Sequence, residues 1–137
     1  MEYVAFWIGA SKLGAISALI NTANTGDLLL HSIQIAKAKF IICHGALMPS
    51  LCVISEQLSR STKVFVYAED EPMSWTLTGL NMINMHAALQ TSNKLNPPNC
   101  GDGLTLSNQT LIIYTSGTTG ASIKAVRING YKEPFEA

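Results

Sequence analysis

Leu111-Ile112-Ile113-Tyr114, followed directly by Thr115-Ser116-Gly117-Thr118-Thr119-Gly120, is the stretch that decides the fold of this chain. The first four residues are apolar, β-branched or aromatic, which predicts a short buried strand. The two glycines let the backbone that follows take positive φ and approach a ligand closely. The serine and threonine hydroxyls add donors beside the backbone N–H groups, and a concave set of such donors suits an anion. The stretch therefore predicts a strand that ends in a loop for the phosphates of a nucleotide.

The same residues also suit an ordinary polar turn between two strands, and their composition does not separate the two interpretations. The spacing excludes two other nucleotide loops. A Walker A loop needs Gly-Lys followed by Ser or Thr, and a dinucleotide fingerprint needs the pattern Gly-x-Gly-x-x-Gly. Neither pattern occurs at this loop.

Strand-like and helix-like patterns alternate upstream of the loop. Ile16–Asn21, Phe40–Cys43 and Lys63–Tyr67 are short apolar runs typical of strands. The segments between them carry apolar residues at three- and four-residue steps, as on one face of a helix: Leu29, Leu30, Ile33 and Ala36, then Leu47, Leu51, Ile54 and Leu58. This rhythm predicts parallel βαβ units and an α/β fold, in which a loop leaves the carboxyl end of a strand to meet a nucleotide.

The segment Tyr3–Ile20 is mostly apolar and invites two interpretations. A membrane span needs ~20 predominantly apolar residues, and Lys12 near the centre would cost roughly 2.5–3.5 kcal/mol on insertion. The segment also lacks the basic region of a signal peptide. One apolar face repeats at helical steps, at Tyr3, Phe6, Trp7, Ala10, Leu13 and Ser17. We therefore expect a buried helix rather than a membrane span.

The pattern between residues 68 and 108 is weaker. Glu69-Asp70-Glu71 is an acidic run of the kind found in solvated turns. Asn81–Leu89 suits a helix rich in Met and Asn, and the composition of Asn96–Gly103 predicts a loop.

Charge and composition exclude several classes of protein. Nine basic and nine acidic residues give a net charge of zero, so the chain lacks the basic footprint of a nucleic-acid-binding protein. The sequence has no run of more than two neighbouring lysines and arginines, which argues against a polybasic membrane patch. Charged residues make up 13% of the chain against a typical ~25%, so apolar surface is expected to be exposed.

The cysteines and histidines do not have the spacing of metal ligands. No Cys-x-x-Cys pair occurs, so the sequence predicts neither a zinc site nor a disulfide framework, and free thiols fit a reducing compartment. The residues concerned are Cys43, Cys52, Cys100, His31, His44 and His86.

The loop resembles the phosphate-binding signature of the AMP-forming acyl-CoA synthetase superfamily. That signature reads Tyr or Phe, Thr-Ser-Gly, Ser or Thr, Thr-Gly, any residue, Pro-Lys. More narrowly, the chain resembles the fatty acid transport protein and very-long-chain acyl-CoA synthetase branch. The supporting segments lie far upstream and in the same order as in that branch, at Glu2–Trp7, Lys12–Gly14, Ala18–Thr22 and Leu29–Ser32. The resemblance covers residues 2–125, which implies a partial adenylation domain over residues 1–125 and an unrelated tail over residues 126–137.

The resemblance implies a two-step ligase reaction. ATP and a long-chain fatty acid give an acyl-adenylate and pyrophosphate, and coenzyme A then displaces AMP to form a thioester. It also implies that the loop holds the β- and γ-phosphates through positioning and charge neutralisation. The binding residues it implies are Thr115, Ser116, Gly117, Thr118, Thr119, Gly120 and Lys124.

The chain departs from the family pattern after the loop. Ser122 and Ile123 stand where the family has Pro and Lys, and Lys124 comes one residue late. In a strand, a one-residue slip moves a side chain to the opposite face, so Lys124 reaches the phosphates only if the loop absorbs the extra residue. The family's adenine-binding segment, Mg²⁺ ligand and catalytic lysine have no counterpart, so we expect no catalytic or metal-binding residue in this chain.

The chain is therefore expected to be an inactive internal piece of a fatty acid–CoA ligase that uses ATP, Mg²⁺ and coenzyme A. Its parent is expected at the plasma membrane, the endoplasmic reticulum or the peroxisome, anchored by a segment before Met1. Two alternatives remain open. The chain could be a non-catalytic regulator that pairs with a full-length relative through its sheet edges, or the product of an incomplete gene model.

Overall fold

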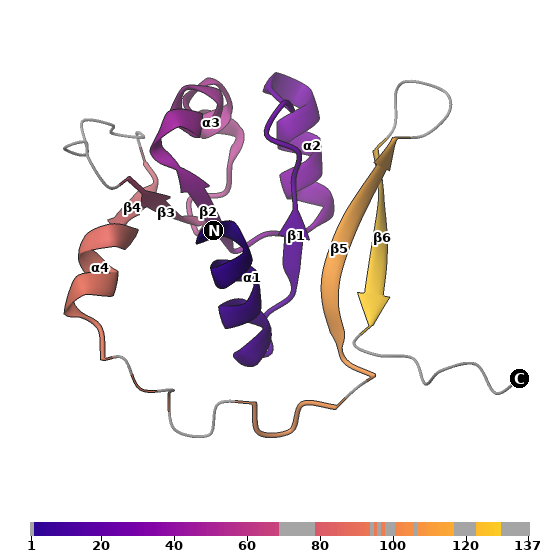
Figure 1. Cartoon of the computed structure of the whole chain (residues 1–137). Coiled ribbons are helices and arrows are strands. Elements are labelled where there is room, and N and C mark those ends of the chain that lie inside the picture. The colour runs from indigo at the N-terminus through magenta and orange to yellow at the C-terminus, as the bar shows by residue number, and fades with distance from the viewer. Residues whose placement is uncertain are drawn as a thin grey trace, which may run out of the picture. The chain divides into compact units, whose positions relative to one another are not determined.

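The computed structural model describes residues 2–68, 79–93, 95, 97, 101–105, 107–116 and 123–129, with 116 and 123–129 described by their backbone (Figure 1). The described residues form a mixed α/β structure with two three-stranded sheets. The chain divides into two compact units, one made of residues 1–20 and 95–137 and the other of residues 21–94. Both sheets contain parallel strands, which confirms the predicted α/β class.

The first unit contains helix α1 (Glu2–Lys12) and strands β1 (Ser17–Leu19), β5 (Gln109–Ser116) and β6 (Ile123–Asn129). Strand β5 is the middle strand of this sheet. It pairs in parallel with β1 and antiparallel with β6. The unit therefore joins two segments that lie far apart in the sequence.

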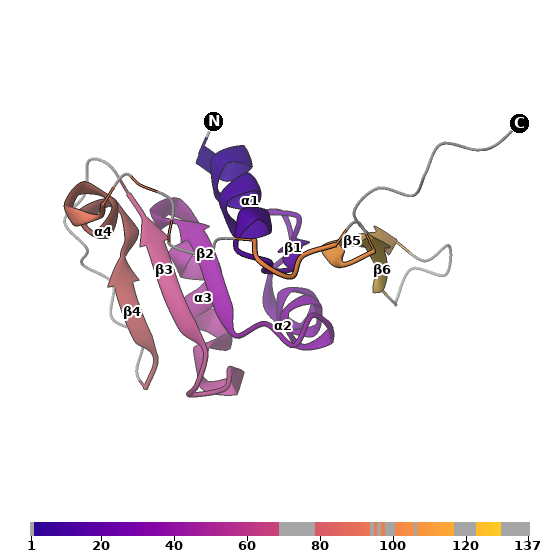
Figure 2. The same cartoon turned by 90° about the horizontal axis from the view of Figure 1, so that it is seen from below.

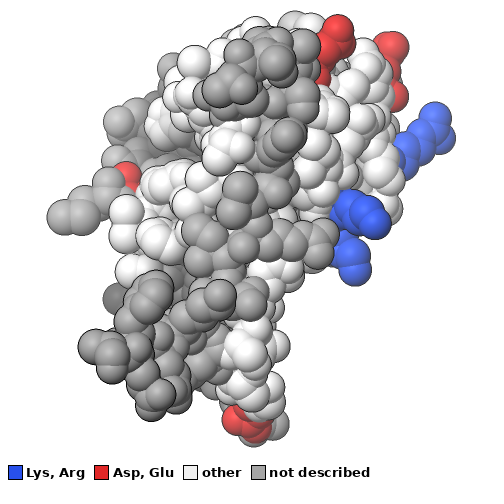
Figure 3. Space-filling view, turned by 90° about the vertical axis from the view of Figure 1, so that its right-hand side faces the viewer, with Lys and Arg blue, Asp and Glu red and all other residues white. Residues whose placement is uncertain are grey.

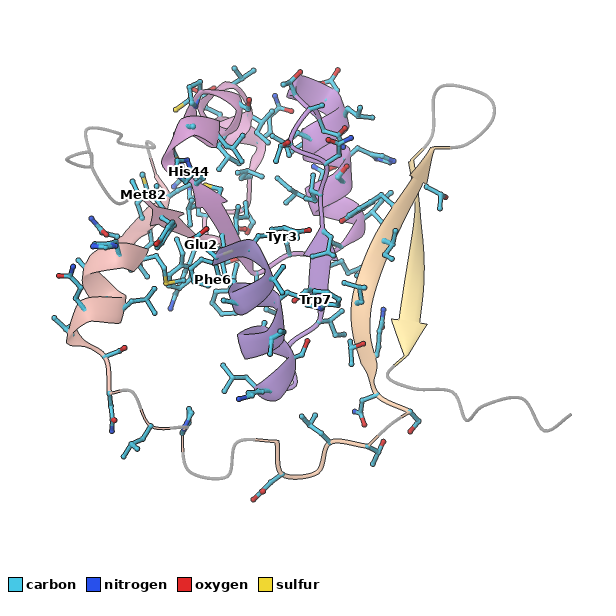
Figure 4. All side chains as sticks on the ribbon, viewed as in Figure 1. Glu2, Tyr3, Phe6, Trp7, His44 and Met82 are labelled. Carbon is cyan, nitrogen blue, oxygen red and sulfur yellow. The ribbon has the colours of Figure 1, made fainter. Side chains whose placement is uncertain are left out.

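Helix α1 is shorter and more exposed than the sequence suggested. It ends at Lys12, and none of its residues is buried, so the prediction of one buried helix over Tyr3–Ile20 is wrong. Phe6 and Trp7 are half-buried, whereas Tyr3 is 57% exposed. Figure 4 shows Tyr3 and Trp7 projecting from the same side of the helix, as expected for residues four apart. No helix among the described residues has the length and hydropathy needed to cross a bilayer.

Gly14 explains where α1 ends. Its φ of 73° lies in the left-handed region, which glycine adopts without steric cost. The Gly14 N–H donates to the Ser11 carbonyl at 3.0 Å, and the Ala15 N–H donates to the Ala10 carbonyl at 3.0 Å. This pair of hydrogen bonds is a Schellman motif, which satisfies the last carbonyls of the helix and turns the chain toward β1.

The second unit contains a fully parallel sheet of β2 (Phe40–His44), β3 (Lys63–Tyr67) and β4 (Asn81–Asn84) in that order (Figure 2). Helix α2 (Gly26–Ile35) precedes β2, helix α3 (Met48–Ile54) lies between β2 and β3, and helix α4 (Met85–Thr91) follows β4. Single 3₁₀ turns, Gly45–Leu47 and Ser55–Gln57, flank α3. Figures 1 and 2 together show α3 covering one face of the sheet.

The core of the second unit lies between α3 and that face. Met48, Leu51 and Ile54 form the buried stripe of α3, and Val64 and Val66 are the buried residues of β3. From α2, Leu29 and Ile33 are buried, which confirms two positions of its predicted stripe. Alternation along β3 leaves Phe65 and Tyr67 on the opposite face, where they are half-buried.

Two helix predictions in the second unit need correction. The segment Asn81–Leu89 is a strand followed by a helix, because the Asn84 side chain caps α4 by accepting a hydrogen bond from the Ala87 N–H at 2.9 Å. The predicted helix over Leu47–Leu58 is broken into the α-helix Met48–Ile54 and the two 3₁₀ turns. The acidic run 69–71 lies outside the described residues, as does half of the predicted loop 96–103.

Candidate phosphate loop

Strand β5 is the platform of the candidate site. Leu111 and Ile112, next to each other, are both only 7% exposed, so side chains on both faces of the strand are buried. The strand predicted over Leu111–Tyr114 is confirmed and extends from Gln109 to Ser116, but Ile113 is 39% exposed rather than buried. Tyr114 is half-buried, and this desolvation raises the pKa of its hydroxyl above the ordinary value. A strand held on both sides gives the following loop a fixed starting point.

The direction of β5 decides where the loop begins. Because β5 runs parallel to β1, with Leu19 opposite Ile113, the carboxyl ends of both strands lie at the same edge of the sheet. The loop residues leave β5 from this edge. In α/β sheets, ligands bind outside the carboxyl ends of the strands, so Ser116, the last residue of β5, lies at the edge where a ligand site is expected.

Strand β6 returns antiparallel to β5 and defines the register of the hairpin. Ser116 pairs with Ile123, and Thr115 pairs with Lys124. The connection between the paired residues is therefore 117–122, and it includes the extra residue by which the chain departs from the family signature. The backbone of Lys124 lies within the ladder, one pair away from the Ser116–Ile123 pair that borders the connection.

The predicted site residues fall into two groups. The backbones of Thr115, Ser116 and Lys124 are placed by the β5–β6 ladder, and the Thr115 side chain is exposed. Gly117, Thr118, Thr119 and Gly120 lie outside the described residues. The expectation that Lys124 reaches the phosphates only if the loop absorbs the extra residue stays a prediction, because only the backbone of Lys124 is described.

Histidines and cysteines take part in local contacts. The His44 Nδ1 accepts a hydrogen bond from the Ala46 N–H at 3.1 Å, and the His86 ring lies 2.7 Å from the Gln90 side chain. The Cys43 thiol lies 3.8 Å from the Met48 sulfur, and burial raises the pKa of Cys43 to about 11. In the described part of the chain, no three His, Cys, Asp or Glu side chains are grouped as metal ligands.

Sequence reasoning missed one cluster at the carboxyl edge of the second sheet. The His44 ring centroid lies 6.5 Å from that of Tyr67, and the Tyr67 and His86 centroids are 6.0 Å apart in an edge-on arrangement. Strand pairing places His44 directly opposite Tyr67. These residues come from separate elements, so only the register of the parallel strands could have revealed their proximity.

The described strands form an α/β fold in which β5 ends at the carboxyl edge that it shares with β1. A family model of AMP-binding enzymes matches residues 1–127, and the chain belongs to the AMP-binding enzyme family.

Several curated proteins are similar to this chain. Long-chain fatty acid transport protein 1 from Rattus norvegicus is 29% identical over 129 residues, covering 93% of this chain and 19% of the relative. Long-chain fatty acid transport protein 6 from Mus musculus is 28% identical over 125 residues, with 91% and 19% covered. The chain thus spans about a fifth of the length of these relatives.

A solved structure supports the fold. A natural red-emitting luciferase from Phrixothrix hirtus matches with a TM-score of 0.69 and 21% identity. The match covers 95% of this chain and 30% of the luciferase chain. The described α/β architecture therefore resembles part of the fold of this luciferase.

Proposed function

We propose that this chain carries the triphosphate-binding loop of an ATP-dependent, AMP-forming long-chain fatty acid–CoA ligase. The observation that carries the proposal is the hairpin of β5 and β6, whose connection leaves the carboxyl edge of a parallel strand pair and contains the residues of the family signature. Membership of the AMP-binding family supports an adenylate-forming reaction. The names of the relatives support a long-chain fatty acid as the acid substrate.

The donor set of the loop suits a triphosphate. Ser116, Thr118 and Thr119 supply hydroxyl donors, and Gly117 and Gly120 allow the backbone N–H groups to face an anion. Lys124 would supply a positive charge against the β- and γ-phosphates. These residues would hold the pyrophosphate portion of ATP still while a carboxylate attacks the α-phosphorus.

The other components of the reaction are proposed for the ligase as a whole. Mg²⁺ would neutralise charge on the triphosphate, and coenzyme A would accept the acyl group. The described residues contain no grouped metal ligands, so no step is assigned to Mg²⁺ here. Membrane association of the ligase is proposed from its relatives, whose names describe fatty acid transport.

Titration calorimetry of ATP into the 137-residue chain tests the proposal. Each hydrogen bond to a charged group contributes about 1.5–3 kcal/mol, so the Thr118→Ala/Thr119→Ala variant should bind ATP at least about tenfold more weakly. Lys124→Ala should also weaken binding. AMP, which lacks the β- and γ-phosphates, should bind wild type and both variants equally.

Matched variants separate the loop from the rest of the surface. Thr22→Ala/Thr91→Ala removes two hydroxyls from exposed positions in the other unit, and Lys12→Ala removes one exposed charge from α1. Both controls should bind ATP like the wild type. Equal ATP affinity in the loop variants and in these controls would refute the role of the loop.

A further inference from the structure

Four cationic side chains gather at the amino end of the second sheet. Lys37 and Lys39 lie directly before β2, and Arg60 and Lys63 lie before and at the start of β3. Because β2 and β3 are parallel, their amino ends meet at one edge, with Phe40 opposite Lys63. The Lys63 N–H donates to the Lys39 carbonyl at 3.0 Å, which joins the two segments. We call these four residues together with Phe40 the basic edge.

The basic edge is exposed and carries a local excess of positive charge. All four cationic residues are exposed. Among the described residues, Glu56 contributes a carboxylate nearby, in the 3₁₀ turn that precedes Arg60. The local net charge is therefore about +3, although the whole chain has none. Figure 3 shows Lys and Arg side chains together along the right-hand edge of the view. The expectation that the chain has no polybasic membrane patch considered only neighbours in sequence, whereas the pairing of β2 with β3 also brings Lys39 and Lys63 together in space.

Apolar side chains continue from the basic edge across the sheet. Phe40 is 58% exposed and Ile42, two residues further along the same face of β2, is 44% exposed. The Phe65 ring lies 6.0 Å from the Phe40 ring and extends the apolar strip onto β3. The other face of this sheet is the one that α3 covers, so the strip is not part of that core.

From this combination we infer that the basic edge docks on an anionic membrane surface. Lysine and arginine side chains contact acidic headgroups, while exposed aromatic and aliphatic side chains enter the boundary between headgroups and acyl chains. Nucleic acid would use the cations but would gain little from the aliphatic Ile42. Charge complementarity and the apolar strip together therefore favour a lipid surface. The inference rests on the proposed function in that it names a surface for the proposed membrane association, but it uses neither ATP nor the loop, so vesicle binding and ATP binding can fail independently.

The expected binding is weak and strongly dependent on charge. Each Lys or Arg near an anionic surface contributes about 1 kcal/mol, which is about fivefold in the partition coefficient. Four such residues and one inserted phenylalanine give a partition coefficient on the order of 10³ M⁻¹, which millimolar lipid can reveal. Binding should fall steeply with salt, because exposed charges are screened.

Vesicle sedimentation of the full chain without ATP tests the inference. Vesicles of phosphatidylcholine mixed with phosphatidylserine should bind the chain, and vesicles of phosphatidylcholine alone should bind it far less. Lys39→Ala/Lys63→Ala should lower the partition coefficient about 25-fold. The charge-preserving Lys39→Arg/Lys63→Arg should keep it, and circular dichroism confirms that each variant is folded.

Matched controls separate the basic edge from general charge and apolarity. Lys12→Ala/Lys132→Ala removes the same charge elsewhere in the sequence and should retain most of the binding, so that a loss equal to that of the edge variant overturns the inference. Phe40→Ala should weaken binding to anionic vesicles about fivefold, whereas Val53→Ala, at a position 71% exposed on α3, should not. Absence of binding, equal binding to neutral vesicles, or insensitivity to Phe40→Ala would each overturn the inference.

Discussion

The strained end of α2 offers a quantitative test of the structure. Lys37 has a φ of 50°, which is the left-handed conformation, and among the described residues it is the one non-glycine residue with a positive φ. The helix needs this conformation because the Lys37 N–H donates to the Gln34 carbonyl at 2.9 Å and the Ala38 N–H donates to the Ile33 carbonyl at 3.3 Å. A residue with a Cβ loses about 1–2 kcal/mol in this conformation.

Lys37→Gly should therefore stabilise the chain. Glycine removes the strain, but it also makes the unfolded chain more flexible, which costs about 0.5–1 kcal/mol of stability. The free energy of unfolding should therefore rise by about 0.5–1 kcal/mol. Urea unfolding followed by circular dichroism measures this gain. With a slope of about 1–3 kcal/mol per molar urea, the midpoint should rise by roughly 0.2–1 M.

Lys39→Gly is the matched control, since Lys39 lies two residues away, is also exposed and does not have a positive φ. It should destabilise the chain by about 0.5–1 kcal/mol. Lys37→Ala keeps a Cβ on a residue in the left-handed conformation and therefore keeps the strain, so it should leave the urea midpoint almost unchanged. A Lys37→Gly variant that is as unstable as Lys39→Gly would refute the strained cap.

Three further predictions concern the core, a glycine and a thiol. Met48→Ala should cost about 2–5 kcal/mol of unfolding free energy because Met48 is 0% exposed, whereas Val53→Ala, at 71% exposure, should change it by less than about 0.5 kcal/mol in the same urea assay. Gly14→Ala should destabilise the chain by about 1–2 kcal/mol because the φ of Gly14 is 73° and a Cβ there would lie 2.8 Å from a leucine methyl. Gly9→Ala should be neutral or stabilising, because a Cβ there would have no heavy atom within 4 Å. Thermal unfolding measures both changes in stability, and the same sign for both would contradict the prediction. Burial raises the pKa of Cys43 from 9.0 to about 11, so the protonated thiol stabilises the fold below pH 9 and this contribution, on the order of 2–3 kcal/mol, is lost as the pH rises toward 11. A Cys43→Ala variant should lose stability less steeply across that interval, and equal pH dependence of both proteins would disprove the assignment.

The first helix shows where sequence patterns lose their force. Tyr3, Phe6 and Trp7 have helical spacing and they do lie on a helix, yet none of them is buried. Periodicity reports the local conformation, whereas burial depends on what packs against the helix. The position of Gly14 in the sequence could have predicted the end of the helix, because a glycine after an apolar helical run is a stop signal.

The segment after the loop shows the opposite limit. A turn between two strands was one interpretation of the loop residues, but the pairing of residues 123–129 with β5 could not be predicted, because the segment departs from the family pattern. Antiparallel pairing requires two segments to align their backbone hydrogen bonds, and this depends on the length of the connection between them. The tertiary structure was needed to place the Lys124 backbone opposite Thr115.

The sequence by itself determined the family, the α/β class and the strand that carries the loop. Signature residues and apolar runs are local properties, and the order of neighbouring residues is sufficient to read them. Only the tertiary structure decided which strands pair and that β5, which precedes the loop, shares its carboxyl edge with β1. Only the tertiary structure also decided that Lys39, Phe40 and Lys63 meet at the amino edge of the other sheet. These features arise from contacts between segments distant in sequence, which form because paired strands satisfy each other's backbone hydrogen bonds and bury a common apolar face.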